Sequence, residues 1–267
     1  MGPVRELTEL ADLRRCERVQ RTVWGGDELE VTAASQLKAA VHAGALVAGA
    51  FEGDELLGFV FSFPSYTRCG DGWRVGQHSH LLAVRPEARG RGIGRQLKWF
   101  QRAWCLARGV THVTWTFDPL QARNARLNLE HLGAYATRYY PDFYGPLGGL
   151  NGTGPSDRLL AEWPLTAPHV AALAAGEARA APPTAVATGL ELDPEGRPLV
   201  HRVPADAQAV RLEVPARVDL RGGDPLTLTW RLALREVMQP LLARGLRATR
   251  FFRGGYLLEA AAHAPDA

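Results

Sequence analysis

The 267-residue sequence predicts an α+β protein: a mixed central sheet flanked by helices, followed by a second, smaller α+β domain. Segments with helical spacing alternate with hydrophobic strands up to residue 165. Residues 167–187 are then mostly Ala, Pro, Gly and Thr, a composition typical of a linker. Strand, helix and hairpin patterns follow. We therefore expect domains at 1–165 and 188–267, joined by a linker at 166–187.

The composition predicts a globular protein without a disulfide framework, a metal site or a membrane span. The 46% hydrophobic and 22% charged residues are ordinary for a globular chain, and 31 basic against 28 acidic residues leave a net charge of only +3. Three cysteines, Cys16, Cys69 and Cys105, are odd in number and lack metal-ligand spacing, so neither a disulfide framework nor a metal site is expected. The N-terminus lacks the apolar core of a signal peptide, and the run 43–51 is too short to span a bilayer. We expect a cytoplasmic protein without membrane contact.

Hydrophobic spacing predicts the elements of the first domain. Residues 5–24 have the period of a helix, and Leu37, Ala40 and Val41 mark a second, short one. Residues 45–51 and 56–63 read as strands around a turn at 52–55. A Gly-rich loop is expected at about 64–77.

The next segment predicts a strand, a loop and an amphipathic helix. The strand is 78–84, and the helix begins within 89–94 and ends near Gly109, with an apolar face formed by Ile93, Leu97, Phe100 and Trp104. A strand at 113–117 leads to Asp118 and Pro119, which resemble a helix cap, and that helix reaches Gly133.

Four elements are predicted beyond the linker. They are strands near 199–203 and 209–214, a helix at about 225–244, and a hairpin of 246–252 with 256–260 around Gly254 and Gly255.

The loop before the amphipathic helix contains the pattern most indicative of function. Arg89, Gly92 and Gly94 form an [Arg/Gln]-x-x-Gly-x-Gly pattern between a strand and a helix. Glycine tolerates positive φ and lets backbone N–H groups approach an anion, and the helix N-terminus adds partial positive charge. Such a loop suits a pyrophosphate.

In order and spacing, residues 5–165 resemble the GNAT superfamily of N-acyltransferases. The loop 89–94 stands between the fourth-strand stretch and its helix, and Leu132-Gly133-Ala134 stands where the superfamily often has Leu-Gly-Phe. Several short motifs also resemble those of a bacterial and archaeal subgroup of predicted acetyltransferases. They are Ser79-His80, Trp115-Thr116-Phe117-Asp118-Pro119-Leu120, Asn124-Ala125, Asn128, Tyr144-Gly145 and Asp157-Arg158.

The resemblance implies direct acyl transfer from acetyl-CoA or another short acyl-CoA, without a metal. A neutral amine attacks the thioester, and a backbone N–H at the splayed end of the fourth strand stabilises the oxyanion. The pantetheine would pair with Leu82, Ala83 and Val84. The donor phosphates would contact the loop and helix start, formed by Arg89, Gly90, Arg91, Gly92, Ile93, Gly94 and Arg95. Asn124 and Asn128, spaced i, i+4, either bind the donor or bond a neighbouring strand.

The sequence departs from the superfamily at the usual acid. Counting back from Leu132-Gly133, the frequent Tyr falls on Leu129 and the frequent Asn on Ala122. Four tyrosines follow, of which Tyr144 is our first candidate for protonating the thiolate and Tyr140 the second, ahead of Tyr135 and Tyr139. Alternatively the thiolate leaves unassisted, because a thiol of pKa about 8.5 is a good leaving group.

Two other groups have a structural alternative. His78 and His80 are two apart on a strand and should share a face; His80 is the candidate base or relay, and the alternative is a hydrogen-bonded wall. Asp118 is a candidate base, although a helix cap is favoured.

A basic run surrounds the loop: Arg85, Arg89, Arg91, Arg95, Lys98 and Arg102. We expect at least two phosphate contacts from it, the alternative being a solvated helix face. No nucleic-acid-binding motif accompanies the run, so no nucleic-acid partner is expected. Four tryptophans are expected in a core or interface, namely Trp24, Trp99, Trp104 and Trp115.

These expectations favour an N-acyltransferase acting on the amine of a small molecule. An amino acid or derivative is preferred, since Arg123, Arg138 and Arg158 border the acceptor side and are suited to hold a carboxylate, unless they are plain surface arginines. Acetyl is the default group, with succinyl or another short acyl open. The alternative is a noncatalytic acyl-CoA-binding sensor. The second domain either roofs the acceptor pocket, joins subunits of a homodimer or is a degenerate acyltransferase half.

Overall fold

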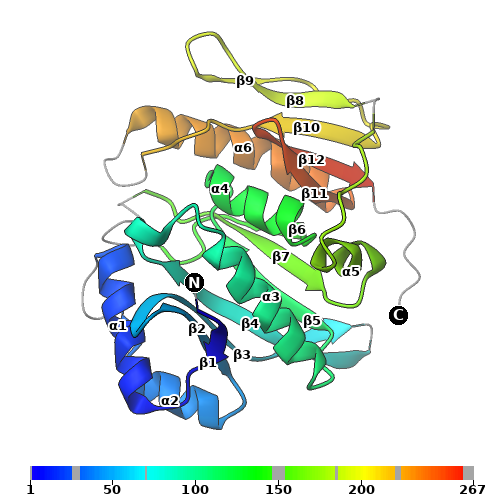
Figure 1. Cartoon of the computed structure of the whole chain (residues 1–267). Helices are drawn as coiled ribbons and strands as arrows, with labels where there is room; N and C mark the ends of the chain where they lie inside the picture. The colour runs from blue at the N-terminus through cyan, green and yellow to red at the C-terminus, as the bar shows by residue number, and fades with distance from the viewer. Residues whose placement is uncertain are drawn as a thin grey trace. The chain divides into compact units, whose positions relative to one another are not determined.

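The computed structural model describes residues 2–25, 31–69, 71–145, 154–183, 186–219 and 224–260. It separates into two compact units (Figure 1). The first unit runs to Trp115 and includes Pro164–Ala167, and the second contains the rest of the described chain from Thr116 onward.

The first unit is built on a mixed sheet with strand order β1-β2-β3-β4-β5. Neighbouring strands are antiparallel except β4 and β5, which are parallel. Its elements are β1 (Val4–Glu6), α1 (Leu10–Trp24), α2 (Ala34–His42), β2 (Leu46–Glu52), β3 (Glu55–Cys69), β4 (Gly72–Val84), a 3₁₀ turn (Pro86–Ala88), α3 (Ile93–Leu106) and β5 (His112–Phe117). The last two residues of β5 belong to the second unit.

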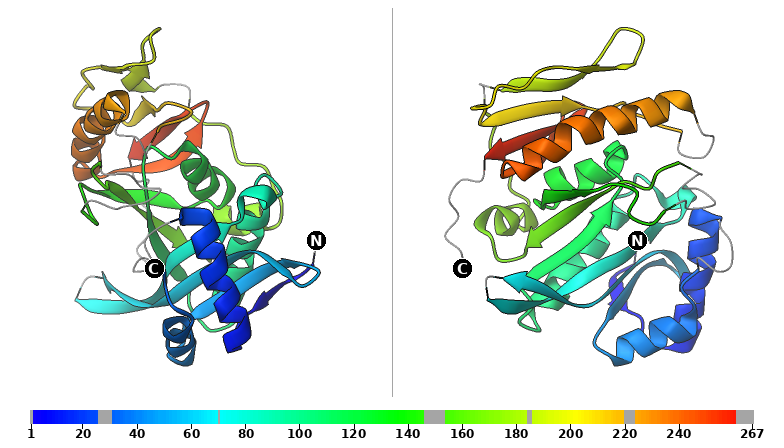
Figure 2. Two further views of the ribbon diagram at one scale, coloured as in Figure 1. Left: turned by 90° about the vertical axis from the view of Figure 1, so that its left-hand side faces the viewer. Right: turned by 180° about the vertical axis from the view of Figure 1, so that it is seen from behind.

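Helices cover both faces of this sheet (Figures 1 and 2). Leu13 of α1 and Leu37 of α2 are fully buried in one cluster with Phe59 and Phe61 of β3. Helix α3 packs on the opposite face. Its Ile93, Leu97 and Trp104 are buried as their spacing predicted, and Phe100 is half-buried.

The strands of the second unit follow one another in the order β7-β6-β11-β12-β10-β8-β9. Helix α6 packs along β6, β8, β9 and β11. The elements are α4 (Ala122–Ala125), a π-helical segment (Arg126–His131), β6 (Tyr135–Tyr140), β7 (Arg158–Pro164), α5 (Pro168–Ala174), β8 (Ala187–Leu192), β9 (Pro198–Val200), β10 (Ala209–Glu213), α6 (Pro225–Ala243), β11 (Leu246–Phe252) and β12 (Gly255–Ala260).

The predicted C-terminal helix and hairpin are confirmed as α6, β11 and β12. Asp224 caps α6, because its carboxylate accepts hydrogen bonds from the N–H groups of Leu226 and Thr227 at 3.1 and 3.2 Å. Pro225 occupies the first helical position, where no N–H is needed.

Two local predictions in the first domain are wrong. Residues 64–77 belong to the turn end of the β3–β4 hairpin rather than to a loop, with Pro64 opposite Gln77 and Cys69 opposite Gly72. The strand-forming residues between them outweigh the glycines, which gather near the turn. The first helix begins at Leu10, since Val4–Glu6 forms edge strand β1 against β2.

The C-terminal part of the chain shares a sheet with residues 135–164. Strand β11 pairs with β6 through Ala248 and Ala136, and Arg250 forms an ion pair with Glu130 at 2.8 Å. Helix α5 lies inside the predicted linker. The compact units therefore divide near Trp115, whereas the sequence-based boundary lies at residue 165.

Candidate functional site

Strands β4 and β5, the last two in the strand order of the first unit, separate part of the way along their length. They pair only at Gln77 with Val113 and His78 with Thr114, although β4 continues to Val84. On its other side β4 pairs with β3 along its whole length, but Leu81 lies opposite Phe61 and Ser79 opposite Ser62. His80 is thus the extra residue of a β-bulge, which bends a strand and re-aims its groups.

The bulge lies just beyond the last β4–β5 pair, so the strand turns away from β5 there. The segment after it carries Leu82, Ala83 and Val84, the predicted pantetheine partners. These residues keep their pairing to β3 but have no partner in β5 among the described residues. Their position is the splayed strand end that the sequence resemblance implied.

The glycine loop follows directly and forms an open nest of backbone N–H groups. Gly90 and Gly92 have φ of +82° and +79°, and nothing lies within 4 Å of a Cβ built at either position. Within the described chain, the N–H groups of Gly90, Arg91 and Gly92 donate to no backbone carbonyl. The N–H groups at the start of α3 likewise lack helical partners. Such groups bind phosphates well.

Some side chains around the glycine loop are held by burial or by polar partners, and others are exposed. Ile93 is buried and anchors the start of α3, Gly94 is its second residue, and Arg95 is exposed. Arg91 forms an ion pair with Glu52, and Arg89 Nε lies 3.4 Å from the carbonyl oxygen of Val84. Arg102 donates to the carbonyl oxygen of Leu165 at 2.9 Å.

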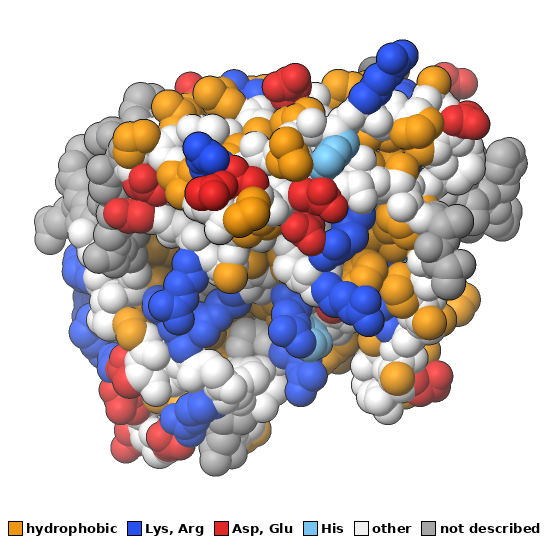
Figure 3. Space-filling view, turned by 90° about the horizontal axis from the view of Figure 1, so that it is seen from above, with side chains coloured by type: hydrophobic (Ala, Val, Ile, Leu, Met, Phe, Trp, Pro, Cys, Tyr) orange, Lys and Arg blue, Asp and Glu red, His pale blue; other side chains and the backbone are white. Residues whose placement is uncertain are grey.

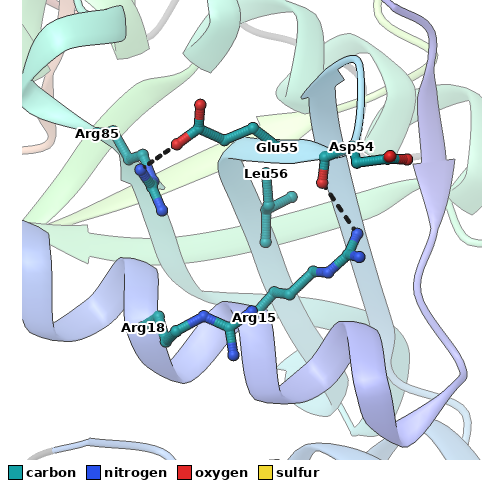
Figure 4. A pocket seen from close by; sticks show the side chains of 6 residues that line it. All are labelled: Arg15, Arg18, Asp54, Glu55, Leu56 and Arg85. Carbon is teal, nitrogen blue, oxygen red and sulfur yellow. Dashed lines mark hydrogen bonds and ion pairs between the residues drawn. The ribbon is translucent and has the colours of Figure 1, made fainter.

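Arg85 lines a pocket of about 210 Å³ together with two arginines of α1 (Figure 4). Its Nη1 lies 2.5 Å from Glu55 and 3.3 Å from Glu87. Arg15, from α1, donates to the carbonyl oxygen of Asp54 at 3.1 Å, and Arg18 completes the basic wall. Arg85 is therefore held by carboxylates in this pocket.

Lys98 is not exposed with the rest of the basic run, so it is not one of the run's candidate phosphate contacts. Its side chain is buried, at 2% exposure, because it lies on the sheet-facing side of α3. Nζ donates to Ser79 Oγ at 3.1 Å and to Gln101 Oε1 at 2.7 Å, and lies 3.8 Å from the ring centre of Trp115. Sequence reasoning missed this cluster; the only signal was the position of Lys98 one residue after the apolar Leu97.

The two histidines share a face of β4, as predicted. Both rings pack against Phe63, at centroid distances of 5.5 Å for His78 and 5.7 Å for His80. His78 Nδ1 lies 3.1 Å from Thr114 Oγ1, and burial lowers its pKa to about 4. His80 is exposed at the bulge, and partial desolvation lowers its pKa from the ordinary 6.5. Both lowered pKa values favour the neutral imidazole, the form that a base requires.

The candidate tyrosines lie in the second unit and differ in accessibility. Tyr144 is 43% exposed, its hydroxyl lies 3.4 Å from Thr116 Oγ1, and the Arg158 guanidinium lies 5.0 Å over its ring. Tyr140 is half-buried and packs on Phe143.

Tyr139, by contrast, is buried and donates to Asp157 at 2.6 Å. Burial and the neighbouring carboxylate of Asp157 raise the pKa of Tyr139 well above its usual range. Arg235 holds the same carboxylate at 2.7 and 3.0 Å. The hydroxyl of Tyr139 is therefore a structural donor.

Asp118 is neither the expected helix cap nor an unpaired base. Its carboxylate accepts from the N–H of Leu120, but α4 begins only at Ala122 with Gln121 before it. Arg231 of α6 donates to both carboxylate oxygens, at 3.2 and 2.8 Å. A partner 113 residues away cannot be read from the local pattern.

Asn124 and Asn128 do not present one exposed face. Asn124 is exposed on α4, whereas Asn128 is 5% exposed, and Leu129 is fully buried. Residues spaced i, i+4 share a face at 3.6 residues per turn, but this helix becomes π-helical at Arg126 and its turns widen.

Two of the three predicted carboxylate-binding arginines share a face of the β6–β7 pair. Arg138 lies opposite Leu160, and Arg158 lies opposite Tyr140, two residues along. Arg158 Nε is buried without a hydrogen-bond partner. Arg123 is exposed on α4.

The surface is mixed in charge. On the face in Figure 3, Lys and Arg side chains form several groups with acidic and hydrophobic side chains between them. Within the described ranges, none of the helices has the length and apolar character needed to cross a bilayer. The same ranges hold no group of three or more His, Cys, Asp or Glu side chains placed for a metal.

A mixed sheet with helices on both faces, a splayed strand pair and a glycine loop opening a helix define the first unit as an acyltransferase-type domain. Residues 8–133 match the family model described as the acetyltransferase (GNAT) family. This part of the chain is therefore a GNAT-family acetyltransferase domain.

Several solved structures match part of the chain at low sequence identity. A putative GNAT acetyltransferase from Desulfovibrio desulfuricans is 18% identical, with a TM-score of 0.49, over 61% of this chain and 98% of that one. The Escherichia coli ribosomal-protein-S18-alanine N-acetyltransferase is 17% identical, with a TM-score of 0.49, over 62% and 96%. A putative Salmonella typhimurium acetyltransferase, with its cofactor acetyl-CoA, is 18% identical, with a TM-score of 0.48, over 62% and 96%. A search of curated proteins found no match.

Proposed function

We propose that this protein transfers an acyl group, acetyl by default, from acyl-CoA to the amine of a small molecule, with an amino acid or derivative as the preferred acceptor. Residues 1–165 would form the catalytic domain. The observation that carries the proposal is the bulge at His80 where β4 leaves β5, next to the open glycine nest before α3.

The loop residues fit the donor's pyrophosphate. The N–H groups of Gly90, Arg91 and Gly92 are available as donors, and the start of α3 adds partial positive charge. A side chain at either positive-φ glycine would occupy the space where phosphate oxygens approach. Arg89 and exposed Arg95 supply further positive charge at the rim.

Acyl transfer from a thioester to an amine requires few side-chain groups. The acceptor nitrogen forms a bond to the thioester carbon, charge moves to the carbonyl oxygen, and the carbon–sulfur bond then breaks to release thiolate. A backbone N–H of the bulged β4 segment would stabilise the oxygen, a contribution worth about 10² to 10³ in rate at other oxyanion sites. His80, whose lowered pKa favours the neutral form, would take the amine proton directly or through water.

Tyr144 is our candidate for returning a proton to the thiolate, with Tyr140 second. Tyr144 is the more exposed of the two, and the guanidinium of Arg158 over its ring would stabilise negative charge that appears nearby. Tyr139 is dropped from the candidates, because Asp157 holds its hydroxyl.

An acceptor with a carboxylate is supported by Arg158. Its Nε is buried and lacks a hydrogen-bond partner, and it lies next to Tyr144 and opposite Tyr140. A buried guanidinium with an unused donor gains most from a bidentate anion. Amino acids should therefore be better acceptors than their primary amides.

The test is turnover of acetyl-CoA and succinyl-CoA, followed as free thiol, with a panel of amino acids, the corresponding amides, polyamines, aminoglycosides and peptide N-termini. Amine-dependent thiol release with an acylated amine as product supports the proposal. Coenzyme A binding without turnover on any amine overturns it in favour of an acyl-CoA sensor, an alternative suggested by Leu129 at the usual tyrosine position. Arg158→Met should raise the acceptor KM for amino acids but not for amides, whereas Arg197→Met, at an exposed arginine, should change neither.

A further inference from the structure

A buried polar cluster joins three elements where β4 and β5 part. Lys98 projects from α3, and its Nζ reaches Ser79 Oγ on β4 and the ring of Trp115 on β5. Ser79 and Trp115 each come one residue after the last β4–β5 pair, His78 with Thr114. Lys98 thus spans the two strands at the point of their separation.

The contact to β4 falls beside the bulge. Ser79 is the last β4 residue with a regular β3 partner before His80 interrupts the register. Its side chain is buried, and its hydroxyl also donates to Gln101 Oε1 at 3.3 Å. A bond that restrains Ser79 also restrains the peptide unit joining it to His80, and so the direction of the neighbouring backbone groups.

Stability alone does not account for a lysine at this position. Removing an ammonium from water costs several kcal/mol, and apolar residues of similar volume commonly replace buried charges without loss of stability. The cluster is also incompletely bonded, since Gln101 Nε2 is buried without a hydrogen-bond partner, as is Oγ of Ser62, the β3 residue opposite Ser79. Such polar networks are usually explained by specificity or function.

Lys98 is also placed to change its bonding near neutral pH. Burial lowers its pKa from 10.5 to about 7, against the opposite influence of Cys105 on the same helix. The positive charge of Lys98 in turn contributes to lowering the pKa of His78 on β4. The ammonium can only donate to Ser79 Oγ, whereas the neutral amine can accept from it, so the direction of this hydrogen bond can reverse.

We propose that Lys98 is a positioning residue of the acyl-transfer site, which acts through Ser79 and Trp115 to hold the β4 bulge and the separation of β4 from β5 in the geometry that acyl transfer requires. The inference rests on the proposed function, because it assigns the bulge a role in that reaction. Lys98 itself touches neither donor nor acceptor in this scheme.

The kinetic test compares Lys98→Met and Ser79→Ala with Lys38→Met. Lys38 and Lys98 are the two lysines of the chain, and Lys38, on α2, donates to the carbonyl oxygen of Thr8. We expect Lys98→Met to lower kcat about 10- to 100-fold, the scale of small misplacements, with a donor KM within about threefold of wild type. Ser79→Ala, a smaller change that keeps the fold if Lys98→Met does not, should lower kcat in the same direction, and Lys38→Met should leave it unchanged.

The pH profile separates positioning from plain packing. At saturating donor, the wild type and Lys38→Met should share an inflection near pH 7 that Lys98→Met lacks. Folded Lys98→Met and Ser79→Ala proteins with wild-type kcat and an unchanged profile would overturn the inference while leaving the proposed function intact.

A spectroscopic measurement decides the inference if the wild type shows no turnover. Labelling with ¹³C-lysine gives two side-chain signals, and Lys38→Met assigns them. The Lys98 signal should titrate near pH 7, together with backbone amide shifts at Ser79, His80 and Leu81. Amides that do not move with this titration, and are the same in Lys98→Met, would overturn the inference independently of any activity.

Discussion

Arg231 and Asp118 form a two-point ion pair across 113 residues of sequence, with N···O distances of 3.2 and 2.8 Å. Both side chains are largely buried, at 5% and 13% exposure. One turn further along α6, Arg235 holds Asp157, which is fully buried. The pair of arginines thus ties α6 to the residues that follow β5 and precede β7.

The ion pair should be a major contributor to stability. Arg231→Met leaves a buried carboxylate unpaired, so we expect the free energy of unfolding to fall by about 3 to 5 kcal/mol in urea titration. Arg197 pairs with Asp193 at 63% exposure, and Arg197→Met should cost less than about 1 kcal/mol. Equal losses in the two variants would contradict this assignment.

Gly92→Ala should weaken coenzyme A binding. Its φ of +79° makes a Cβ cost about 1 to 2 kcal/mol of stability, and the new methyl group points into the proposed phosphate space. Gly109→Ala is the matched control, since Gly109 has φ +72° and equally open surroundings. Calorimetry should show an affinity loss of tenfold or more, about 1.4 kcal/mol, for Gly92→Ala alone. If both variants bind coenzyme A like the wild type, the loop is not the phosphate site.

Tyrosine-to-phenylalanine changes should separate catalysis from structure. Tyr144→Phe should lower kcat by about 10², the low end for general-acid help, with little change in stability, because its hydroxyl makes only a long contact to Thr116. Tyr139→Phe should instead lower the free energy of unfolding by about 1.5 to 3 kcal/mol, since its hydroxyl bonds a buried carboxylate. Full turnover in Tyr140→Phe and Tyr144→Phe, with chemistry rate-limiting, would favour unassisted departure of the thiolate.

His78 should make the protein less stable in acid. Its pKa is about 4 when folded against 6.5 for the free side chain, so between these values the unfolded chain binds a proton that the folded chain does not. The free energy of unfolding should therefore fall as the pH drops from about 6.5 to 4, by at most about 3 kcal/mol from this residue. His80 acts in the same direction, so the measure is the difference between wild type and His78→Asn in this window. An unchanged slope in the variant would show that His78 is not the titrating group.

Local patterns determined much of the first unit. The apolar spacing of Ile93, Leu97 and Trp104 predicts α3, and the glycines before it predict the turn from which α3 starts, because both depend only on neighbours in sequence. The helical pattern at about 225–244 and the glycines at 254 and 255 likewise predicted α6 and the last hairpin. The acetyltransferase family was also evident from the order of these pieces.

Only the tertiary structure decided how polar residues are used. Sequence alone left Lys98 in a basic run and Asp118 as a cap, but α3 turns the lysine toward Ser79 and α6 brings Arg231 to the aspartate. The β4 bulge is equally invisible in sequence, since it depends on the register with β3. A helix or turn is set by contacts a few residues apart, whereas burial, ion pairing and strand register depend on partners brought together only by folding.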